Sequence, residues 1–138
     1  MILLTGDTTD DAISVLHLDD ERGALTTTEN YFERFEEGIE VETTTDPEGA
    51  LDRLEADPEA VDLLLCDFEM PAMDGLSVLA AVRDAGLDIP FILYTGKGSN
   101  AVESEALAAG VTTYVEKGEG MDHLESLAAE IEEAVADR

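Results

Sequence analysis

Apolar runs alternate with amphipathic segments along this chain. Residues 63–66 (Leu-Leu-Leu-Cys) form an apolar run without polar interruption, which is typical of a strand buried on both faces of a parallel sheet. The run ends at Asp67, and the following Pro71 and Asp74-Gly75 indicate a turn and then the start of a helix. The pattern predicts a buried strand with a carboxylate at its carboxyl end.

Four other strand segments are predicted in the same way, and each strand is followed by a segment with helical spacing. The predicted strands cover 13–18, 39–44, 63–66, 90–94 and 111–115. The predicted helices cover about 21–35, a segment that begins at Pro47, and then 75–85, 100–109 and 121–135. This alternation predicts an α/β fold with a doubly wound parallel sheet of five strands, in the order 2-1-3-4-5.

The length of 138 residues and the hydrophobic content of 44% are those of one globular domain. We place this domain at 13–136 and interpret residues 1–12, which lack periodicity, as a mobile extension. The single Cys66 excludes an internal disulfide, and no apolar run approaches the ~20 residues of a membrane span. Because a signal-like start is also missing, we expect a cytoplasmic protein.

The charge is the most unusual bulk property, since 34 acidic residues face 7 basic ones and the net charge is −27. Nucleic acid and anionic membranes are poor partners for such a surface. Self-repulsion on this scale destabilises a compact fold unless salt screens it, which favours an origin in a halophilic archaeon. An ordinary acidic protein is the alternative.

Several chemically capable side chains follow the predicted strands. Asp19-Asp20 ends the first strand and Asp67 ends the third, and these strands are neighbours at the switch point of the predicted sheet. In a surface-like dielectric, three carboxylates in one pocket repel each other by ~4 kcal/mol per pair at 4 Å, which indicates that a cation binds there. Because all the ligands are oxygens, the site favours Mg²⁺ together with a phosphoryl group. Thr95 offers a hydroxyl after the fourth strand, and Lys117 a positive charge after the fifth.

Taken together, these residues resemble the receiver domain of two-component response regulators, with its flavodoxin-like fold. The resemblance covers residues 13–136 and is most specific from Asp67 to Gly75, including Met70-Pro71. It implies that Asp67 accepts a phosphoryl group from a histidine kinase or phosphotransfer protein. It also implies a Mg²⁺ site at Asp19, Asp20 and Asp67, in which Asp20 is a direct ligand and Asp19 acts through water.

The same resemblance assigns further roles. The main-chain carbonyl of Glu69 is a metal ligand, Lys117 binds the phosphoryl group, and Thr95 and Tyr114 are the switch residues. The switch would repack the surface formed by helix 100–109, strand 111–115 and the last helix, which also serves some receivers as a homodimer interface. The chain departs from the family at Gly118, where a proline is usual, and at Gly96, where a slightly larger residue is common.

Three other functions stay open from the residues alone. A small Mg²⁺-dependent phosphatase would use the same aspartate nucleophile with Glu69 two positions later, but the chain leaves little room for a substrate-enclosing cap. An interaction domain without phosphorylation and a flavin-binding domain fit less well. We expect His17 to be packed within its strand and His123 to be solvated.

Overall fold

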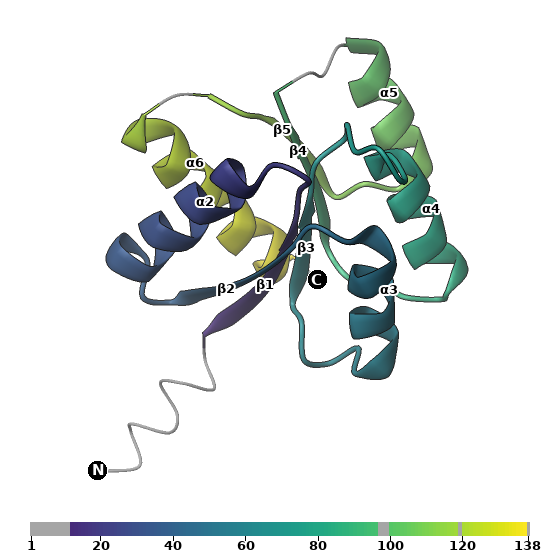
Figure 1. Cartoon of the computed structure of the whole chain (residues 1–138), viewed down its shortest axis with the longest axis horizontal. Coiled ribbons are helices and arrows are strands. Elements are labelled where there is room, and N and C mark those ends of the chain that lie inside the picture. Colours follow the sequence, from purple (N-terminus) through teal and green to yellow (C-terminus); the bar gives the residue numbers. More distant parts are fainter. Residues whose placement is uncertain (1–11, 97–99, 119, 138) are drawn as a thin grey trace.

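The computed structural model describes residues 12–96, 100–118 and 120–137. Within these residues, parallel strands form one five-stranded sheet in the order β2-β1-β3-β4-β5 (Figure 1). The strands are β1 (Ile13–Leu18), β2 (Ile39–Thr44), β3 (Leu63–Cys66), β4 (Phe91–Thr95) and β5 (Thr113–Glu116). The predicted fold class and strand order are confirmed. Of the predicted extension, residues 1–11 lie outside the described part of the chain.

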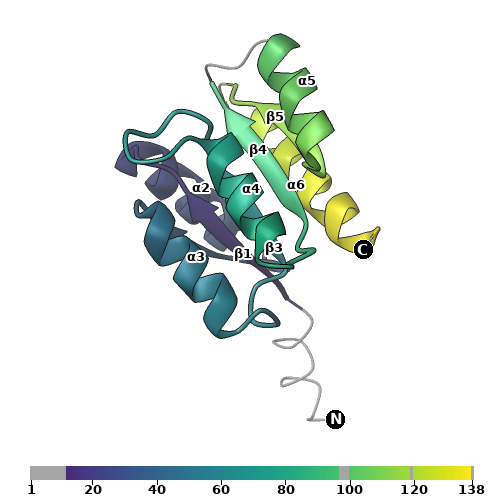
Figure 2. The same ribbon diagram turned by 90° about the vertical axis from the view of Figure 1, so that its right-hand side faces the viewer.

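Helices cover both faces of the sheet, as a buried parallel sheet requires. They are α2 (Arg22–Phe35), α3 (Pro47–Ala56), α4 (Gly75–Asp84), α5 (Asn100–Ala109) and α6 (Met121–Ala136). Figures 1 and 2 show α2 and α6 on one face and α3, α4 and α5 on the other. Among the helices that the structure describes, none is both long and apolar enough to cross a bilayer.

Each face of the sheet has its own apolar core. Strand residues point alternately to the two faces, so Leu64 and Leu93 pack under α3, α4 and α5, whereas Leu65 and Ile92 pack under α2 and α6. All four side chains are fully buried. The uninterrupted apolar runs of the central strands therefore follow from burial on both sides.

Local sequence signals set the starts of α3 and α4. Asp46 caps α3 through a bond from the Glu48 amide (3.1 Å), and Asp74 caps α4 through one from the Ser77 amide (2.8 Å). The fifth strand starts two residues later than predicted because the Val111 amide still bonds to a carbonyl of α5.

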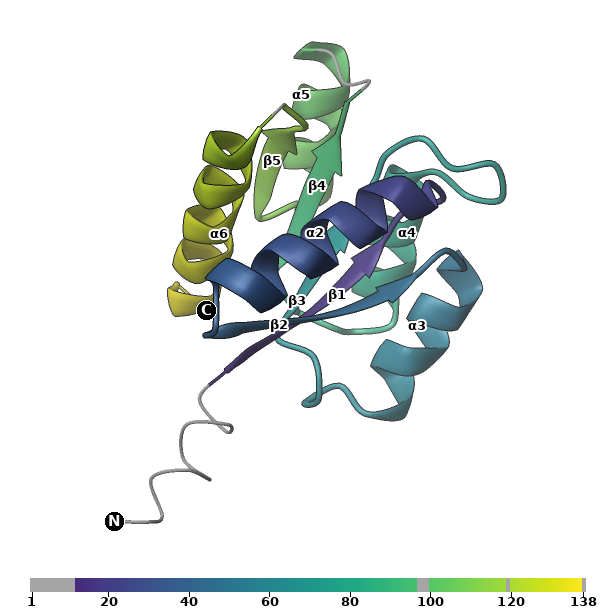
Figure 3. The same ribbon diagram turned by 60° about the vertical axis from the view of Figure 1, so that its left-hand side comes forward.

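The strand register brings the carboxyl ends of β1 and β3 side by side (Figure 3). Leu18 lies opposite Cys66, and the amide of Asp67 donates to the Leu18 carbonyl at 3.0 Å. The next residue on each strand, Asp19 and Asp67, therefore leaves the sheet at the same edge. The fold thus places the acidic residues that follow β1 and β3 in one region.

Candidate functional site

Three carboxylates meet at the carboxyl edge of the sheet. Asp19, Asp20 and Asp67 each offer one oxygen, and these oxygens lie within 4.8 Å of one another. Asp19 and Asp67 are buried, whereas Asp20 is exposed. An all-oxygen set with one solvent-facing member fits a hard divalent cation that keeps part of its water shell, as Mg²⁺ does.

Lys117 brings positive charge to these carboxylates from the end of β5. Its Nζ lies 2.6 Å from Asp19 Oδ2 and 3.6 Å from Asp67 Oδ1. The Lys117 amide bonds to the Thr95 carbonyl at 3.0 Å, which fixes the main chain at the start of the side chain. The lysine therefore ion-pairs mainly with Asp19 in this structure and stands close to Asp67.

Burial and charge act on the Asp67 carboxyl in opposite directions. Burial raises its pKa, and the nearby Asp19 adds to the rise. Lys117, a hydrogen bond from the Thr95 side chain and one from the Phe68 backbone lower the pKa again, but the net shift is upward. Asp67 is thus a carboxylate held in an unfavourable environment, which a bound cation would relieve.

The site opens to solvent through a cleft of about 330 Å³. It is lined by Asp20, Glu21, Asp67, Glu69, Thr95, Gly96 and Lys117. The Glu69 side chain is exposed at the rim, whereas Thr95 is almost completely buried below it. The cleft therefore gives a small solute access to Asp67, with a hydroxyl and an ammonium group on its wall.

Glycine is required where α4 begins beside Asp67. The Gly75 amide bonds to the Phe68 carbonyl at 2.8 Å, and a Cβ at Gly75 would lie 2.5 Å from the Asp67 carbonyl oxygen and 2.7 Å from Leu93 Cδ1. Both distances are too short for any side chain. The Asp74-Gly75 pair therefore caps the helix and lets its first turn pack against the loop that carries Asp67.

Tyr114 lies in β5 on the face covered by α5 and is half-buried. Its hydroxyl is covered and has no hydrogen-bond partner among the described residues. Burial raises the pKa of this hydroxyl, with smaller contributions from Glu116 and Glu103. The ring is thus packed against the core below α5 rather than standing in solvent.

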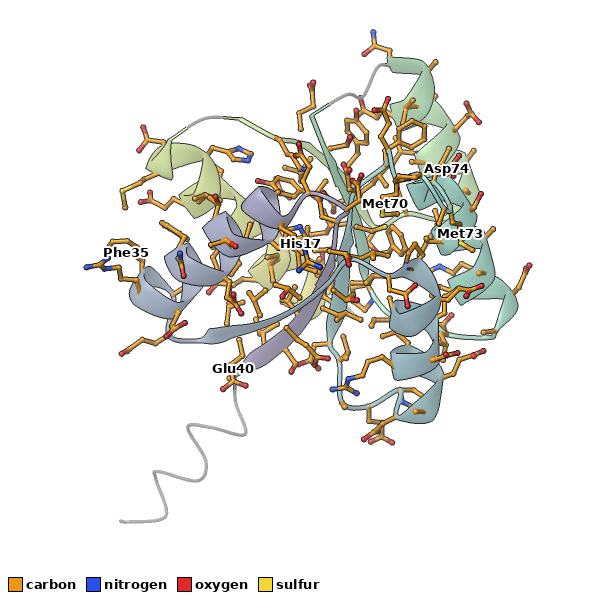
Figure 4. The ribbon with its side chains drawn as sticks, in the orientation of Figure 1. His17, Phe35, Glu40, Met70, Met73 and Asp74 are labelled. Atoms are coloured by element: carbon orange, nitrogen blue, oxygen red, sulfur yellow. The ribbon has the colours of Figure 1, made fainter. Side chains whose placement is uncertain are left out.

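His17 supplies a buried imidazole behind the acidic site, beneath α2 (Figure 4). Its Nδ1 lies 2.8 Å from Thr28 Oγ1, and its Nε2 lies 3.9 Å from Asp19 Oδ2 without a hydrogen bond. Burial, with a smaller contribution from Lys117, lowers the pKa of His17 to about 3. The ring is therefore neutral at ordinary pH and packed, as expected, although its closeness to Asp19 was not foreseen. The one feature of the sequence that could have indicated this closeness is a polar residue within an otherwise apolar strand.

The expectation of a solvated His123 is wrong. Its ring stacks on Tyr94 with centroids 5.5 Å apart and an interplanar angle of 10°, and its Nε2 lies 2.8 Å from the Tyr94 hydroxyl. Burial lowers the pKa of His123 and raises that of Tyr94 to about 12. Sequence spacing gave no sign of this pair because its members come from β4 and α6, 29 residues apart.

The doubly wound sheet with an acidic cluster at its switch point defines a class of open α/β domains that bind their ligands at this edge of the sheet. Residues 15–129 match the family model for the response regulator receiver domain. The chain is 35% identical over 103 residues to the response regulator SaeR of Staphylococcus epidermidis and 34% identical to that of Staphylococcus aureus. The matched segment covers 75% of this chain and 43% of the length of those relatives.

Solved structures agree in fold. The receiver domain of the Francisella response regulator 1452 superposes with a TM-score of 0.79 at 23% identity and covers 91% of this chain and 98% of its own. A CheY-like receiver domain protein from Methanospirillum hungatei gives 0.75 at 26% identity, covering 92% and 99%. The chain belongs to the response regulator receiver domain family of two-component systems. Membership of this family favours a receiver over the phosphatase that the residues alone left open.

Proposed function

We propose that this domain accepts a phosphoryl group on Asp67 from a histidine kinase or phosphotransfer protein. The observation that carries the proposal is an open cleft lined by Asp67, Asp20 and Lys117, with an Asp19 carboxylate oxygen within 4.8 Å of the Asp67 carboxylate. A buried carboxylate with its pKa raised, yet open to solvent on one side, is placed for attack on a small phosphorylated donor. The domain would act on itself rather than on a separate substrate.

In the proposed transfer, a lone pair on an Asp67 carboxylate oxygen attacks phosphorus and forms an acyl phosphate. The phosphorus–nitrogen bond of the donor phosphohistidine breaks, and its electron pair stays on the imidazole, which takes up a proton. Lys117 lies 3.6 Å from Asp67 Oδ1, near enough to neutralise an incoming phosphoryl oxygen. The Thr95 hydroxyl, now bonded to the Asp67 carboxylate, would move to a phosphoryl oxygen.

A divalent ion, Mg²⁺ by its preference for oxygen ligands, would be held by Asp19, Asp20, Asp67 and the main-chain carbonyl of Glu69. When bound, it supplies positive charge for the oxygens of the transferring group. Asp19 would have to exchange its 2.6 Å ion pair with Lys117 for the ion, since its Oδ2 is engaged by Lys117 in this structure. Lys117 would then be released toward Asp67.

We infer that the new phosphoryl group biases a switch in the surface formed by α5, β5 and α6. Thr95 would be drawn toward the phosphoryl group, and Tyr114, which packs against the core below α5, would follow into the space it leaves. A partner, or a second copy of this domain, would read the change on that surface. We expect no nucleic acid or membrane contact by this acidic domain.

We further propose that residues 13–136 form the receiver domain and that the protein is cytoplasmic. We also propose that the surrounding cytoplasm is a concentrated salt solution. The net charge of −27 supports the last point, since its self-repulsion is relieved at high ionic strength.

The test is labelling with radioactive acetyl phosphate. We expect incorporation by the parent chain only with Mg²⁺ present and none in Asp67→Asn, whose amide cannot form an acyl phosphate. An exposed acidic residue away from the cleft, replaced as Glu40→Gln, provides the matched control and should label like the parent. Undiminished labelling of Asp67→Asn would refute the assignment.

A further inference from the structure

The Lys117 side chain has an aromatic neighbour as well as its carboxylate partners. Its Nζ lies 5.6 Å from the centroid of the Tyr94 ring, within the range in which a cation is attracted to a π face. Tyr94 is itself buried and directly precedes Thr95, so it points to the opposite face of the sheet. The Lys117 ammonium group therefore has both carboxylates and an aromatic ring as neighbours.

The Tyr94 ring is held in turn by His123 from the first turn of α6. The two rings are nearly parallel at 5.5 Å, and the Tyr94 hydroxyl lies 2.8 Å from His123 Nε2. Burial lowers the pKa of His123, which favours the neutral imidazole. A neutral imidazole that carries its proton on Nδ1 would accept the Tyr94 hydroxyl proton at Nε2. Stacking and hydrogen bond together fix the plane of the ring below the ammonium group.

Gly118, the residue after Lys117, makes room for this arrangement. A Cβ at Gly118 would lie 3.1 Å from His123 Nδ1 and 3.2 Å from His123 Cγ, closer than most real Cβ contacts. Its backbone is not in the left-handed region, so conformation does not demand a glycine here. The absence of a side chain at 118 instead leaves space for the imidazole.

We propose that Tyr94 and His123 are positioning residues that hold the Lys117 ammonium group beside Asp67. In this chain the stacked Tyr94 and His123 rings hold the lysine in place, and Gly118 leaves the space that the His123 ring occupies. The inference rests on the proposed function, since it concerns the lysine that would neutralise the phosphoryl group. It does not require either ring to touch the reacting atoms.

The first experiment examines the resting protein and needs no phosphorylation. Nitrogen-15 NMR of the histidine side chains should show His123 as one tautomer, with Nδ1 protonated and Nε2 accepting a hydrogen bond. In Tyr94→Phe, which keeps the ring but lacks the hydroxyl, we expect a mixture of tautomers. The same tautomer balance in both proteins would overturn the assigned pair.

The second experiment measures the initial rate of labelling by acetyl phosphate with Mg²⁺. A lost cation–π contact lowers this rate by about three- to fivefold, so we expect that loss in Tyr94→Leu and in His123→Ala. His123→Gln, which offers an acceptor to the Tyr94 hydroxyl, should lie closer to the parent than His123→Ala does. Ser126→Ala, exposed on the same helix, is the matched control and should label at the parent rate.

A double-mutant cycle tests the role of Gly118. Gly118→Ala should slow labelling about twofold or more in the parent, because its Cβ displaces the imidazole, yet change nothing further in the His123→Ala background. Gly38→Ala, where a Cβ meets no atom within 4 Å, serves as the glycine control. Equal effects of Gly118→Ala in both backgrounds would overturn the steric argument.

The outcomes separate the two proposals. A parent chain that is never labelled at Asp67 defeats the proposed function, whatever the NMR result. A parent that is labelled normally, with Tyr94→Leu and His123→Ala both folded and labelled at the parent rate, defeats this inference alone.

Discussion

At the scale of single residues, the charge that makes Asp67 reactive also destabilises the folded protein. Its carboxylate is buried beside Asp19 and is only partly compensated by Lys117, so its pKa is raised by burial above all. Removing the charge should therefore make the fold more stable while it abolishes the chemistry. Such a trade between function and stability is expected at a reactive site.

We expect Asp67→Asn to raise the free energy of unfolding at neutral pH by on the order of 1 kcal/mol in the absence of divalent ions. The folded chain holds the Asp67 proton more tightly than the unfolded chain does. The contribution of Asp67 to the free energy of unfolding is therefore greatest in acid. It is lost as the pH rises from the ordinary aspartate pKa through the raised pKa of the folded state. Urea unfolding of both proteins across this range measures the difference.

The control for that experiment is added Mg²⁺, which should stabilise the parent more than the variant because it binds the folded carboxylate cluster. A variant that is less stable than the parent at every pH would contradict the account of Asp67.

Gly96 is a second residue whose substitution should change one property of the site, the lifetime of the phosphoryl group. A Cβ there would lie 3.7 Å from Lys117 Cβ, an ordinary contact, so Gly96→Ala fits without strain. We expect it to narrow the access of water to the acyl phosphate and lengthen the phosphoryl half-life by about two- to tenfold. Decay of the labelled protein after removal of the donor measures this, and an unchanged half-life would count against the idea.

The sequence identified the residues that follow strands, but not their partners across the fold. Asp19, Asp67, Thr95 and Lys117 could be predicted because the carboxyl ends of parallel strands meet at one edge. The contact of His123 with Tyr94 could not, because it depends on how α6 packs against β4 and no local pattern encodes that.

At the scale of elements, the start of α4 controls the loop that carries Asp67. Asp74 caps the helix, and Gly75 packs against the main chain of Asp67 and the side chain of Leu93. The sequence predicted this helix start well because both signals are local. It misplaced the start of β5 because Val111 is held by the end of α5, which is a tertiary effect.

Gly75→Ala should destabilise the protein by about 2 kcal/mol or more, because its Cβ would lie 2.5 Å from a carbonyl oxygen that cannot easily move. The matched control is Gly23→Ala in α2, where a Cβ meets no atom within 4 Å and alanine favours the helix. That variant should be unchanged or up to about 1 kcal/mol more stable. Equal stability of the two alanine variants in urea unfolding would contradict the close packing at Gly75.

At the scale of the whole molecule, topology and charge are the governing features. The strand order could be predicted because five strand–helix repeats allow few arrangements, and the one found brings β1 and β3 together. The charge of −27 was equally visible in the sequence. The charge affects the stability of the fold and not its strand order, because repulsion between like charges opposes the compact state.

We expect the melting temperature to rise as potassium chloride increases from 0.1 M to 1 M, since the screening length falls from ~10 Å to ~3 Å. Sucrose at matched water activity is the control, because it favours compact states without screening charge. Full stability in dilute buffer, with no gain from salt, would remove the interpretation that this chain works in concentrated salt.

The most direct test of the central claim is to locate the phosphoryl group in the chain. Reduction of the acetyl phosphate-treated protein with borohydride converts an aspartyl phosphate to homoserine, which peptide mass spectrometry assigns to a position. The account predicts homoserine at position 67, only when Mg²⁺ was present during phosphorylation. Homoserine at Asp19 or Asp20 instead, or none at all in folded protein supplied with Mg²⁺, would contradict it.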